Sequence, residues 1–330
     1  MSIIEMRNGK KRISVKWGDQ RIAVPVCGWD TSYPTDLVLQ ILDAKGPARL
    51  CDEIMRDEDP CYIQRTLELS ILGYVDRDAL AGKTLLDFGC GCGASTMVLA
   101  RLFPQTRITG IDMEADFIGV AKARAAHYGF ANTTFNVVSD PKQVLEAGEC
   151  FDFAVLSAVY EHLLPTERLN LIPLIWSSLE TDGLLFINQT PYRWFPIENH
   201  TTGLPLINYL PDRLAYAIVR RFNQRVQTDE SWERLLRRGI RGGTSREIMK
   251  IIRESCQERP ILLEPCHRGC HDRIDLWYTI SSHSRLRLLK QLMRALFKCL
   301  KYSTGLTLLP NLCLAIRKDG SAVRPGVISR

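Results

Sequence analysis

The chain has 330 residues, of which 45% are hydrophobic and 24% charged, and its formal net charge is +6. This composition is typical of an ordinary globular protein with one large domain or two modest ones, and the charge is too small to indicate nucleic-acid binding. Eleven scattered cysteines favour reduced thiols over a disulfide framework. Because no stretch has the length of a membrane span and residues 1–11 lack the apolar core of a secretion signal, we expect a cytoplasmic protein.

The first eighty residues predict a small cap. Two apolar runs, 13–17 and 21–26, flank a Gly-Asp-Gln turn and predict a hairpin. Apolar residues at helical spacing then predict one helix from Asp36 and a second through residues 63–71. We expect these elements to precede the first strand of the main sheet.

Strands and helices are predicted to alternate between residues 84 and 188. Such alternation is typical of a parallel, doubly wound sheet with right-handed crossovers. The predicted strands are 84–88, 107–112, 133–138, 151–156 and 183–188, and the helices between them are 95–102, 114–128 and 167–179.

The alternation stops after residue 189. The segment 190–272 is rich in Pro, Arg and aromatic residues, and we interpret it as a helical insertion over the active-site end of the sheet. Within it, Thr244 and Glu247 have the spacing of a capping box that opens a helix. Beyond it the pattern predicts a strand at 273–280, a helix at 284–302, a last strand at 311–316 and a disordered tail after residue 318.

Residues 84–96, Thr-Leu-Leu-Asp-Phe-Gly-Cys-Gly-Cys-Gly-Ala-Ser-Thr, combine a strand, a glycine turn and a helix start. Gly89, Gly91 and Gly93 permit positive φ and let a ligand lie against the backbone, near the unpaired N–H groups of the helix. A dinucleotide site requires the spacing Gly-x-Gly-x-x-Gly, and Asp87 would repel a pyrophosphate. The stretch therefore favours a cationic ligand without phosphate.

This stretch closely resembles motif I of the class I S-adenosylmethionine-dependent methyltransferases. The resemblance is specific over about residues 85–188 and looser over 191–211. It implies S-adenosyl-L-methionine as cofactor and a Rossmann-like, mostly parallel seven-stranded α/β sheet with an antiparallel last strand. The expected division is an N-terminal cap (1–79), a cofactor-binding core (80–189), a substrate-cap insertion (190–272), the last strands and helix of the core (273–318) and a flexible tail (319–330).

The resemblance places cofactor contacts at the carboxyl ends of the strands. Asp87 and the Gly89 carbonyl would hold the amino group, and Asp112 would accept the ribose hydroxyls. The alternative for Asp112 and Asp140 is a solvated cap or turn residue. The full set of expected cofactor residues is Asp87, Gly89, Gly91, Gly93, Asp112, Met113, Asp140 and Ser157.

Glu161 and His162 follow the fourth strand and resemble a pair in the ubiquinone-biosynthesis O-methyltransferases, where the segment borders the acceptor pocket. Methyl transfer depends on positioning, and a base helps when the acceptor is a hydroxyl. A histidine suits that task near neutral pH. His162 is therefore the first candidate for a catalytic base and Glu161 for a substrate contact; the alternative is that His162 only binds a loop carbonyl.

The start of the insertion supplies a second set of candidates. Residues 191–211 resemble a stretch in bacterial methyltransferases of uncertain acceptor, and Trp194 and Glu198 are expected in a pocket wall. His200 is the second candidate base, with a purely structural role in its own loop as the alternative.

Two further patterns are given less weight. Cys266, His267, Cys270 and His271 cluster within six residues, but structural zinc draws on two separated ligand pairs, so we predict no metal site. The helix 284–302 is basic and apolar, which fits either peripheral membrane contact or a sheet-packing helix with a solvated basic face, the interpretation we favour.

The sequence therefore predicts a methyltransferase acting at oxygen on a small-molecule or glycan-type acceptor. An RNA or other nucleic-acid methyltransferase is the first alternative, because the insertion is rich in arginine, although acids are interspersed with them. A non-catalytic S-adenosylmethionine-binding protein is the second. The pattern leaves the acceptor and the oligomeric state open.

Overall fold

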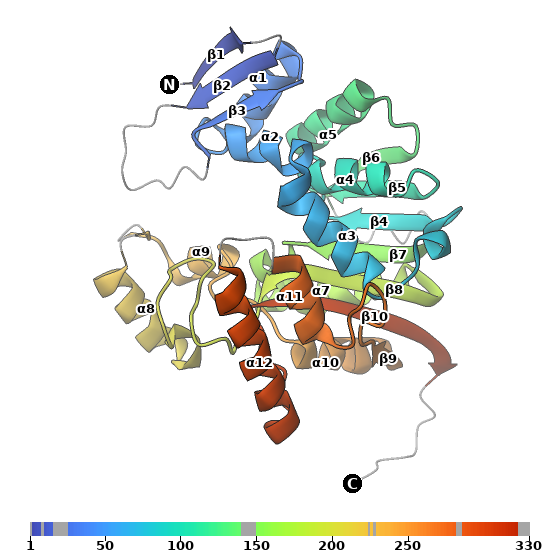
Figure 1. The fold of residues 1–330 in the computed structure, drawn as a ribbon, viewed down its shortest axis with the longest axis vertical. Helices are drawn as coiled ribbons and strands as arrows, with labels where there is room; N and C mark the ends of the chain where they lie inside the picture. The colour runs from blue at the N-terminus through green and yellow to red at the C-terminus, as the bar shows by residue number, and fades with distance from the viewer. Residues whose placement is uncertain are drawn as a thin grey trace.

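The computed structural model describes residues 2–7, 10–15, 26–139, 150–223, 225–226, 229–281 and 286–322 (Figure 1). Its centre is a seven-stranded sheet in the order β6-β5-β4-β7-β8-β10-β9, in which β10 runs antiparallel to both neighbours. The predicted fold class is confirmed. The strands are β4 (Thr84–Phe88), β5 (Arg107–Asp112), β6 (Thr133–Val137), β7 (Phe151–Ser157), β8 (Leu179–Pro191), β9 (Glu258–Leu262) and β10 (Asn311–Ala322).

Helices cover both faces of this sheet. Successive residues of a strand point to opposite faces, so they contact different helices. Leu85 packs with α3 (Arg65–Leu72), α4 (Ala94–Leu102) and α11 (Arg273–Ser281), whereas Leu86 packs with α7 (Pro165–Ser177) and α10 (Ser245–Cys256). A further helix, α5 (Ala115–Tyr128), packs on β6 and α4 and ends at Gly129, as the sequence predicts. The sheet is doubly wound.

The N-terminal cap contains a second, three-stranded antiparallel sheet. In it β2 (Lys10–Val15) lies between β1 (Ser2–Arg7) and β3 (Gly28–Thr31). The predicted hairpin partner, 21–26, lies almost wholly outside the described residues. The predicted helices correspond to α1 (Thr35–Lys45) and to α3 with the end of the short π-helical segment η1 (Pro60–Gln64), while α2 (Leu50–Glu58) was not predicted.

The predicted strand 273–280 is wrong, because these residues form α11. The alternating apolar pattern is misleading here: the intervening Asp275 is buried, and its backbone N–H donates to the Asp272 carboxylate at 2.9 Å, which starts the helix. The strand that completes the sheet is instead β9.

The predicted insertion therefore contains core elements as well as a cap. Thr244 accepts a hydrogen bond from the Glu247 backbone N–H, as predicted, and the helix it opens, α10, packs into the sheet core. Outside the sheet lie η4 (Ile207–Tyr209), α8 (Asp212–Phe222) and α9 (Trp232–Arg237), which share a small apolar cluster.

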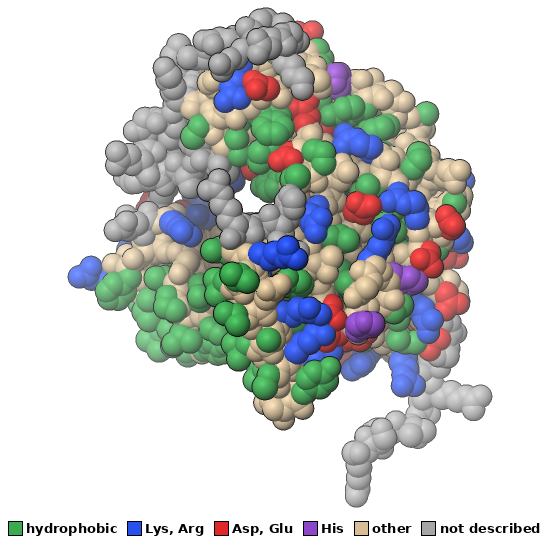
Figure 2. Space-filling view, in the orientation of Figure 1, with side chains coloured by type: hydrophobic (Ala, Val, Ile, Leu, Met, Phe, Trp, Pro, Cys, Tyr) green, Lys and Arg blue, Asp and Glu red, His purple; other side chains and the backbone are tan. Residues whose placement is uncertain are grey.

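The helix α12 (Arg287–Thr304) is oriented opposite to our expectation. Its side chains Arg294 and Lys298 bind Asp275 on α11, and Lys301 binds Asp272. The predicted solvated basic face is therefore wrong. The exposed face is apolar instead, and Figure 2 shows hydrophobic side chains gathered where α8 and α12 lie; those of α12 are Leu288, Leu289, Leu292 and Leu296.

Among the helices of the described residues, none has the length and apolar composition required to cross a bilayer. Contact of α12 with a membrane surface stays an open alternative, and the cytoplasmic location stays a prediction.

Candidate active site

The glycine turn between β4 and α4 is built around backbone that other residues would not tolerate. Gly93 has a φ of +82°, and a Cβ there would lie 2.7 Å from the Cβ of Ala121 on α5. Gly89 and Gly91 also have positive φ, so the turn follows the conformation that the motif predicts. Close packing of α5 against the turn fixes the N-terminus of α4 beside the ends of β4 and β5.

Asp112, the last residue of β5, ties that turn to the neighbouring strand. Its carboxylate accepts hydrogen bonds from the backbone N–H groups of Gly91 at 2.9 Å and Glu114 at 3.1 Å. Two carboxylate oxygens have about four acceptor positions, so further hydroxyl donors can still bind. The carboxylate borders a cavity of about 210 Å³ with mostly apolar walls, among them Gly89, Val138 and Val159.

Met113 is 66% exposed and lines the same cavity. Asp140 lies outside the described residues, although Val138 just before it is in the cavity wall. Ser157, at the end of β7, accepts a hydrogen bond from the Gln189 side chain at 3.1 Å. Its contact with a cofactor stays a prediction.

Asp87 is a fully buried carboxylate at the end of β4. One of its oxygens accepts hydrogen bonds from Ser95 at 2.8 Å and Thr96 at 2.6 Å, the first residues of α4. Burial raises the pKa of Asp87 to about 6, although both hydroxyls oppose the shift. A buried acid that ionises near neutrality is suited to bind a cation.

Glu161, His162 and His200 converge at the carboxyl end of β7. Glu161 and His162 belong to the turn η3 (Tyr160–His162), and His200 comes from the loop after β8. One side-chain N or O atom from each lies within 4.8 Å of those of the other two. The sequence therefore singled out three residues that the fold brings together.

The hydrogen bonds of this cluster define its chemistry. His162 donates from Nδ1 to the Arg237 carbonyl at 2.7 Å, because a carbonyl can only accept, so neutral His162 has its lone pair on Nε2. Glu161 is buried and accepts from the Thr190 hydroxyl at 2.9 Å through Oε2, while Oε1 has no hydrogen-bond partner. Burial raises the pKa of Glu161, and partial burial lowers that of His200.

A second cavity, of about 420 Å³, lies beside this cluster. Its wall combines polar residues such as Asn199 and His200 with apolar ones such as Trp277, and because it is more polar than the cavity at Asp112 we call it the polar cavity. His200 and Ala158 line it, while Val159 lines the apolar cavity, so the two cavities contact consecutive residues of the chain. Asn188, from β8, is buried in its wall, and its side-chain amide oxygen has no hydrogen-bond partner. Arg56, from α2, supplies a positive charge.

Residues 85–183 match a family model described as a methyltransferase domain. The core of this chain is a class I S-adenosylmethionine-dependent methyltransferase domain. The chain is similar to the ubiquinone biosynthesis O-methyltransferase of Methylobacterium sp. (strain 4-46), with 36% identity over 119 residues, which are 34% of this chain and 44% of that protein. It is also similar to the malonyl-[acyl-carrier protein] O-methyltransferase of Bacillus anthracis, with 30% identity over 142 residues, 42% and 50% of the two chains.

The chain thus spans half or less of the length of these curated relatives. A solved structure of an O-methyltransferase family protein from Burkholderia thailandensis has 15% identity and a TM-score of 0.42, covering 68% of this chain and 58% of that one.

Glu198 and Trp194, the two acceptor contacts predicted in the loop after β8, differ in burial. Glu198 is buried and accepts from the backbone N–H groups of residues 200–202 and from the Thr202 hydroxyl, so it orders its own loop. Trp194 is 42% exposed and stacks near Tyr209. Acceptor contacts of Trp194 and Glu198 stay predictions.

Several residues of the site carried no sequence signal. Arg56 comes from the unpredicted helix α2, and Gln189 and Thr190 are ordinary polar residues at the end of β8. Only their position at the carboxyl end of a strand could have identified Gln189 and Thr190.

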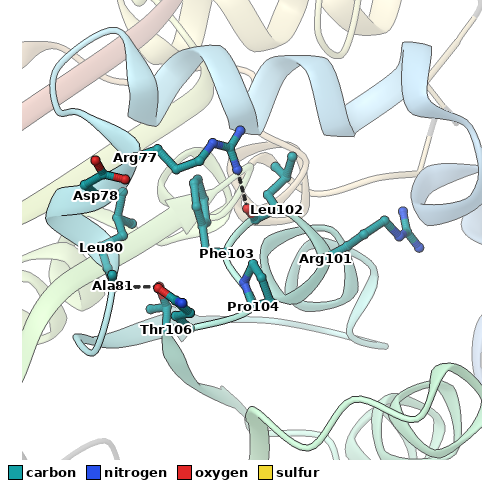
Figure 3. Close-up of a pocket in the computed structure, with 10 residues that line it drawn as sticks. Arg77, Asp78, Leu80, Ala81, Arg101, Leu102, Phe103, Pro104 and Thr106 are labelled. Atoms are coloured by element: carbon teal, nitrogen blue, oxygen red, sulfur yellow. Dashed lines mark hydrogen bonds between the residues drawn. The ribbon is translucent and has the colours of Figure 1, made fainter.

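Another cavity, of about 400 Å³, lies at the opposite end of the sheet (Figure 3). Thr106 donates to the Leu80 carbonyl and Arg77 to the Leu102 carbonyl there, which joins the segments before β4 and β5. Ligands of doubly wound sheets bind beyond the carboxyl ends of the strands, so this amino-end cavity is not the active-site candidate.

The arginines of the insertion are partly engaged in ion pairs. Arg237 binds Glu167, Arg238 binds Glu230, and Arg241 binds Asp212. This pairing reduces the positive charge available to phosphates and disfavours the nucleic-acid alternative.

Proposed function

We propose that this protein transfers the methyl group of S-adenosyl-L-methionine to an oxygen of a small-molecule acceptor. The observation that carries the proposal is the pair of cavities that contact the consecutive residues Ala158 and Val159, one mostly apolar beside the glycine turn and one more polar beside His200. Methyl transfer needs donor and acceptor held in line across a short gap, and adjacent cavities can provide that arrangement.

The apolar cavity suits the adenosyl part of the cofactor. Asp112 would accept the ribose hydroxyls, and Gly89, Met113 and Val138 would form the surrounding wall. Asp87, with its pKa near neutrality, would hold the amino group together with the Gly89 carbonyl. When bound, the cofactor supplies a methyl carbon already activated by its sulfonium.

The polar cavity suits a hydrophilic acceptor. The O-methyltransferase names of the relatives support oxygen as the methylated atom. A hydroxyl acceptor must lose its proton, and both His162, with Nε2 unprotonated in the neutral ring, and His200, in the cavity wall, could accept it. Because His200 lines the cavity, its removal should affect turnover at least as much as that of His162.

The proposal is tested in two stages. Calorimetric titration with S-adenosylhomocysteine should show one site per chain, and a protein without cofactor binding would contradict the proposal. A screen of polar hydroxyl and carboxylate compounds with methyl-labelled cofactor then identifies the acceptor. Label transfer to RNA and not to these compounds would favour the nucleic-acid alternative, and cofactor binding without any transfer would favour a non-catalytic binding protein.

A further inference from the structure

The cluster of Glu161, His162 and His200 contains two facing hydrogen-bond acceptors. Glu161 Oε1 and His162 Nε2 lie 3.8 Å apart, and the proton of the neutral imidazole is on Nδ1, where it binds the Arg237 carbonyl. A distance of 3.8 Å is too long for a hydrogen bond even if Nε2 is protonated. An electropositive atom between them would satisfy both.

Among the described residues, the buried Glu161 carboxylate has no ion pair with a fixed positive charge, and Arg168 acts on it only from a longer distance. The side chain of Glu161 is fully buried. Burying an ionised carboxylate without a counter-charge is costly, so the site favours either a proton or a bound cation. Oε1 is also left without a hydrogen-bond partner, whereas Oε2 is held by Thr190.

We propose that Glu161, His162 and His200 bind a divalent transition-metal ion, of which zinc is the first candidate. Two imidazoles and one carboxylate form a common ligand set of catalytic zinc sites, which keep further positions open. Metal–ligand bonds of about 2.1 Å would place tetrahedral ligand atoms about 3.4 Å apart. The three ligand atoms already lie within 4.8 Å of one another, so small side-chain movements complete the site.

The surroundings of the three ligands have the character of a built site. Metal-binding histidines normally donate their other N–H to a carbonyl, and ligating carboxylates are themselves hydrogen-bonded. His162 donates to the Arg237 carbonyl at 2.7 Å, and Glu161 accepts from Thr190 at 2.9 Å. These contacts orient two of the ligands without occupying Nε2 or Oε1.

Gly239 allows the backbone to close over this cluster. A Cβ at Gly239 would lie 2.7 Å from His200 Cδ2 and 3.1 Å from Glu161 Cγ, and its φ is +87°. The loop can therefore hold His200 against Glu161 only with glycine at this position. Because His200 also lines the polar cavity, the open positions of the metal would be accessible to an oxygen of a ligand there.

The inference goes beyond the proposed methyl transfer, and its test does not depend on activity. The purified full chain is dialysed against a chelator, incubated with one equivalent of Zn²⁺ and analysed by elemental mass spectrometry and competition with a chromophoric chelator. One tightly bound zinc per chain is expected. Co²⁺ in its place should give visible absorption bands of a four- or five-coordinate site with nitrogen and oxygen ligands.

Variants then locate the ion. Glu161→Gln and His200→Asn should each weaken zinc affinity by at least about 100-fold, and Thr190→Val by about 10-fold, as expected for a ligand and for a group that orients one. The control is the double variant Cys266→Ser, Cys270→Ser, because Cys270 and the exposed Cys266 belong to the other cluster of potential ligands, and it should bind zinc as the parent does. Circular dichroism and thermal unfolding show whether each variant is folded.

The proposal is overturned if the parent protein binds no stoichiometric metal, if Glu161→Gln binds zinc as tightly as the parent, or if only the cysteine variant loses it. In the first case the histidines remain candidate bases for the methyl transfer. Binding of S-adenosylhomocysteine to the stripped protein tests the proposed function separately, since none of the three ligands lines the cavity at Asp112.

Discussion

The Asp87 carboxylate accepts a hydrogen bond of 2.6 Å from the Thr96 hydroxyl, and this bond joins the end of β4 to the first turn of α4 across the glycine turn. The carboxylate is buried, which raises its pKa to about 6. Asp87 therefore changes its charge near pH 6. Both the binding of a cation and the stability of the cofactor-free protein should depend on that change.

We predict that cofactor affinity falls as the pH is lowered through about 6. A cationic amino group prefers ionised Asp87, so below this pH binding must release a proton, and affinity should drop by up to about tenfold per pH unit. Calorimetry between pH 5 and 6.5 measures the slope. Asp87→Asn should bind more weakly and show no slope, whereas a slope that persists in this variant would assign the titration to another group.

The raised pKa of Asp87 also affects the stability of the cofactor-free protein. Low pH favours folding through this group, although it weakens cofactor binding. A raised pKa means that the folded state binds the proton more tightly than the unfolded chain does. Asp87 therefore favours folding most at pH values below its ordinary pKa, and this contribution is lost as the pH rises through about 6. Urea unfolding of the parent and Asp87→Asn proteins at pH 5 and pH 7 should show a smaller pH dependence in the variant.

A second prediction concerns Asp112. Removing its carboxylate deletes the expected ribose contacts, and hydrogen bonds to charged groups contribute about 1.5–3 kcal/mol, so Asp112→Ala should weaken cofactor binding by that amount. The carboxylate also holds Gly91 and Glu114, so Asp112→Asn, which keeps one acceptor oxygen, is the matched comparison. A folded Asp112→Ala protein with unchanged affinity would contradict the cofactor assignment.

The sequence predicted the sheet and the conformation of the glycine turn because both depend on local patterns. Strands such as β4 and β5 are apolar runs that end in an acid, and the glycine turn is a contiguous motif. The seventh strand was misplaced because Asp275 looked like the exposed residue of an alternating strand. Asp275 is buried instead, and its charge is paired with Arg294 and Lys298, which are 19 and 23 residues further along the chain.

The acceptor side depends on tertiary contacts that no local pattern contains. His162 and His200 were identified one by one, but their convergence with Glu161 requires the loop after β8 to return over η3. Gly239 allows that close approach, because any side chain there would clash with His200, which is 39 residues earlier in the chain. A local pattern could not distinguish this glycine from any other in a loop.

A third prediction concerns the buried Arg124, which joins α5 of the core to α2 of the cap. Its side chain is fully buried, donates to the Glu53 carbonyl at 2.9 Å and lies 3.8 Å from the buried Asp57 carboxylate. Arg124→Met should lower the free energy of unfolding by about 3–5 kcal/mol, because it leaves Asp57 without its counter-charge. Urea denaturation measures the loss.

The matched control is Lys250→Met, whose ion pair with Glu254 is exposed and should contribute less than about 1 kcal/mol. Replacing both Arg124 and Asp57, as Arg124→Met with Asp57→Asn, should recover part of the stability, since the fully buried unpaired charge is gone and only the partly exposed Glu53, 3.3 Å from Arg124 in the parent, loses its partner. If the single Arg124 variant is as stable as the parent, the ion pair does not hold the cap to the core.

The last prediction concerns the attachment of α12. Asp275 binds Lys298 and Arg294, and these ion pairs lower its pKa despite the opposing effect of burial. A lowered pKa contributes stability that is present above the ordinary value and lost as the pH falls through the folded value. Because α12 exposes most of its leucines, the apolar contacts that could replace these bonds are mainly those of Phe297 and Met293. Asp275→Asn should therefore increase amide hydrogen exchange in α12 at neutral pH, with little change in β4 or α4.

The parent protein should show the same increase in exchange of α12 only in strong acid, near the lowered pKa of Asp275. Equal protection of α12 in both proteins at neutral pH would show that the contacts of Phe297 in the apolar cluster below it are sufficient to hold the helix.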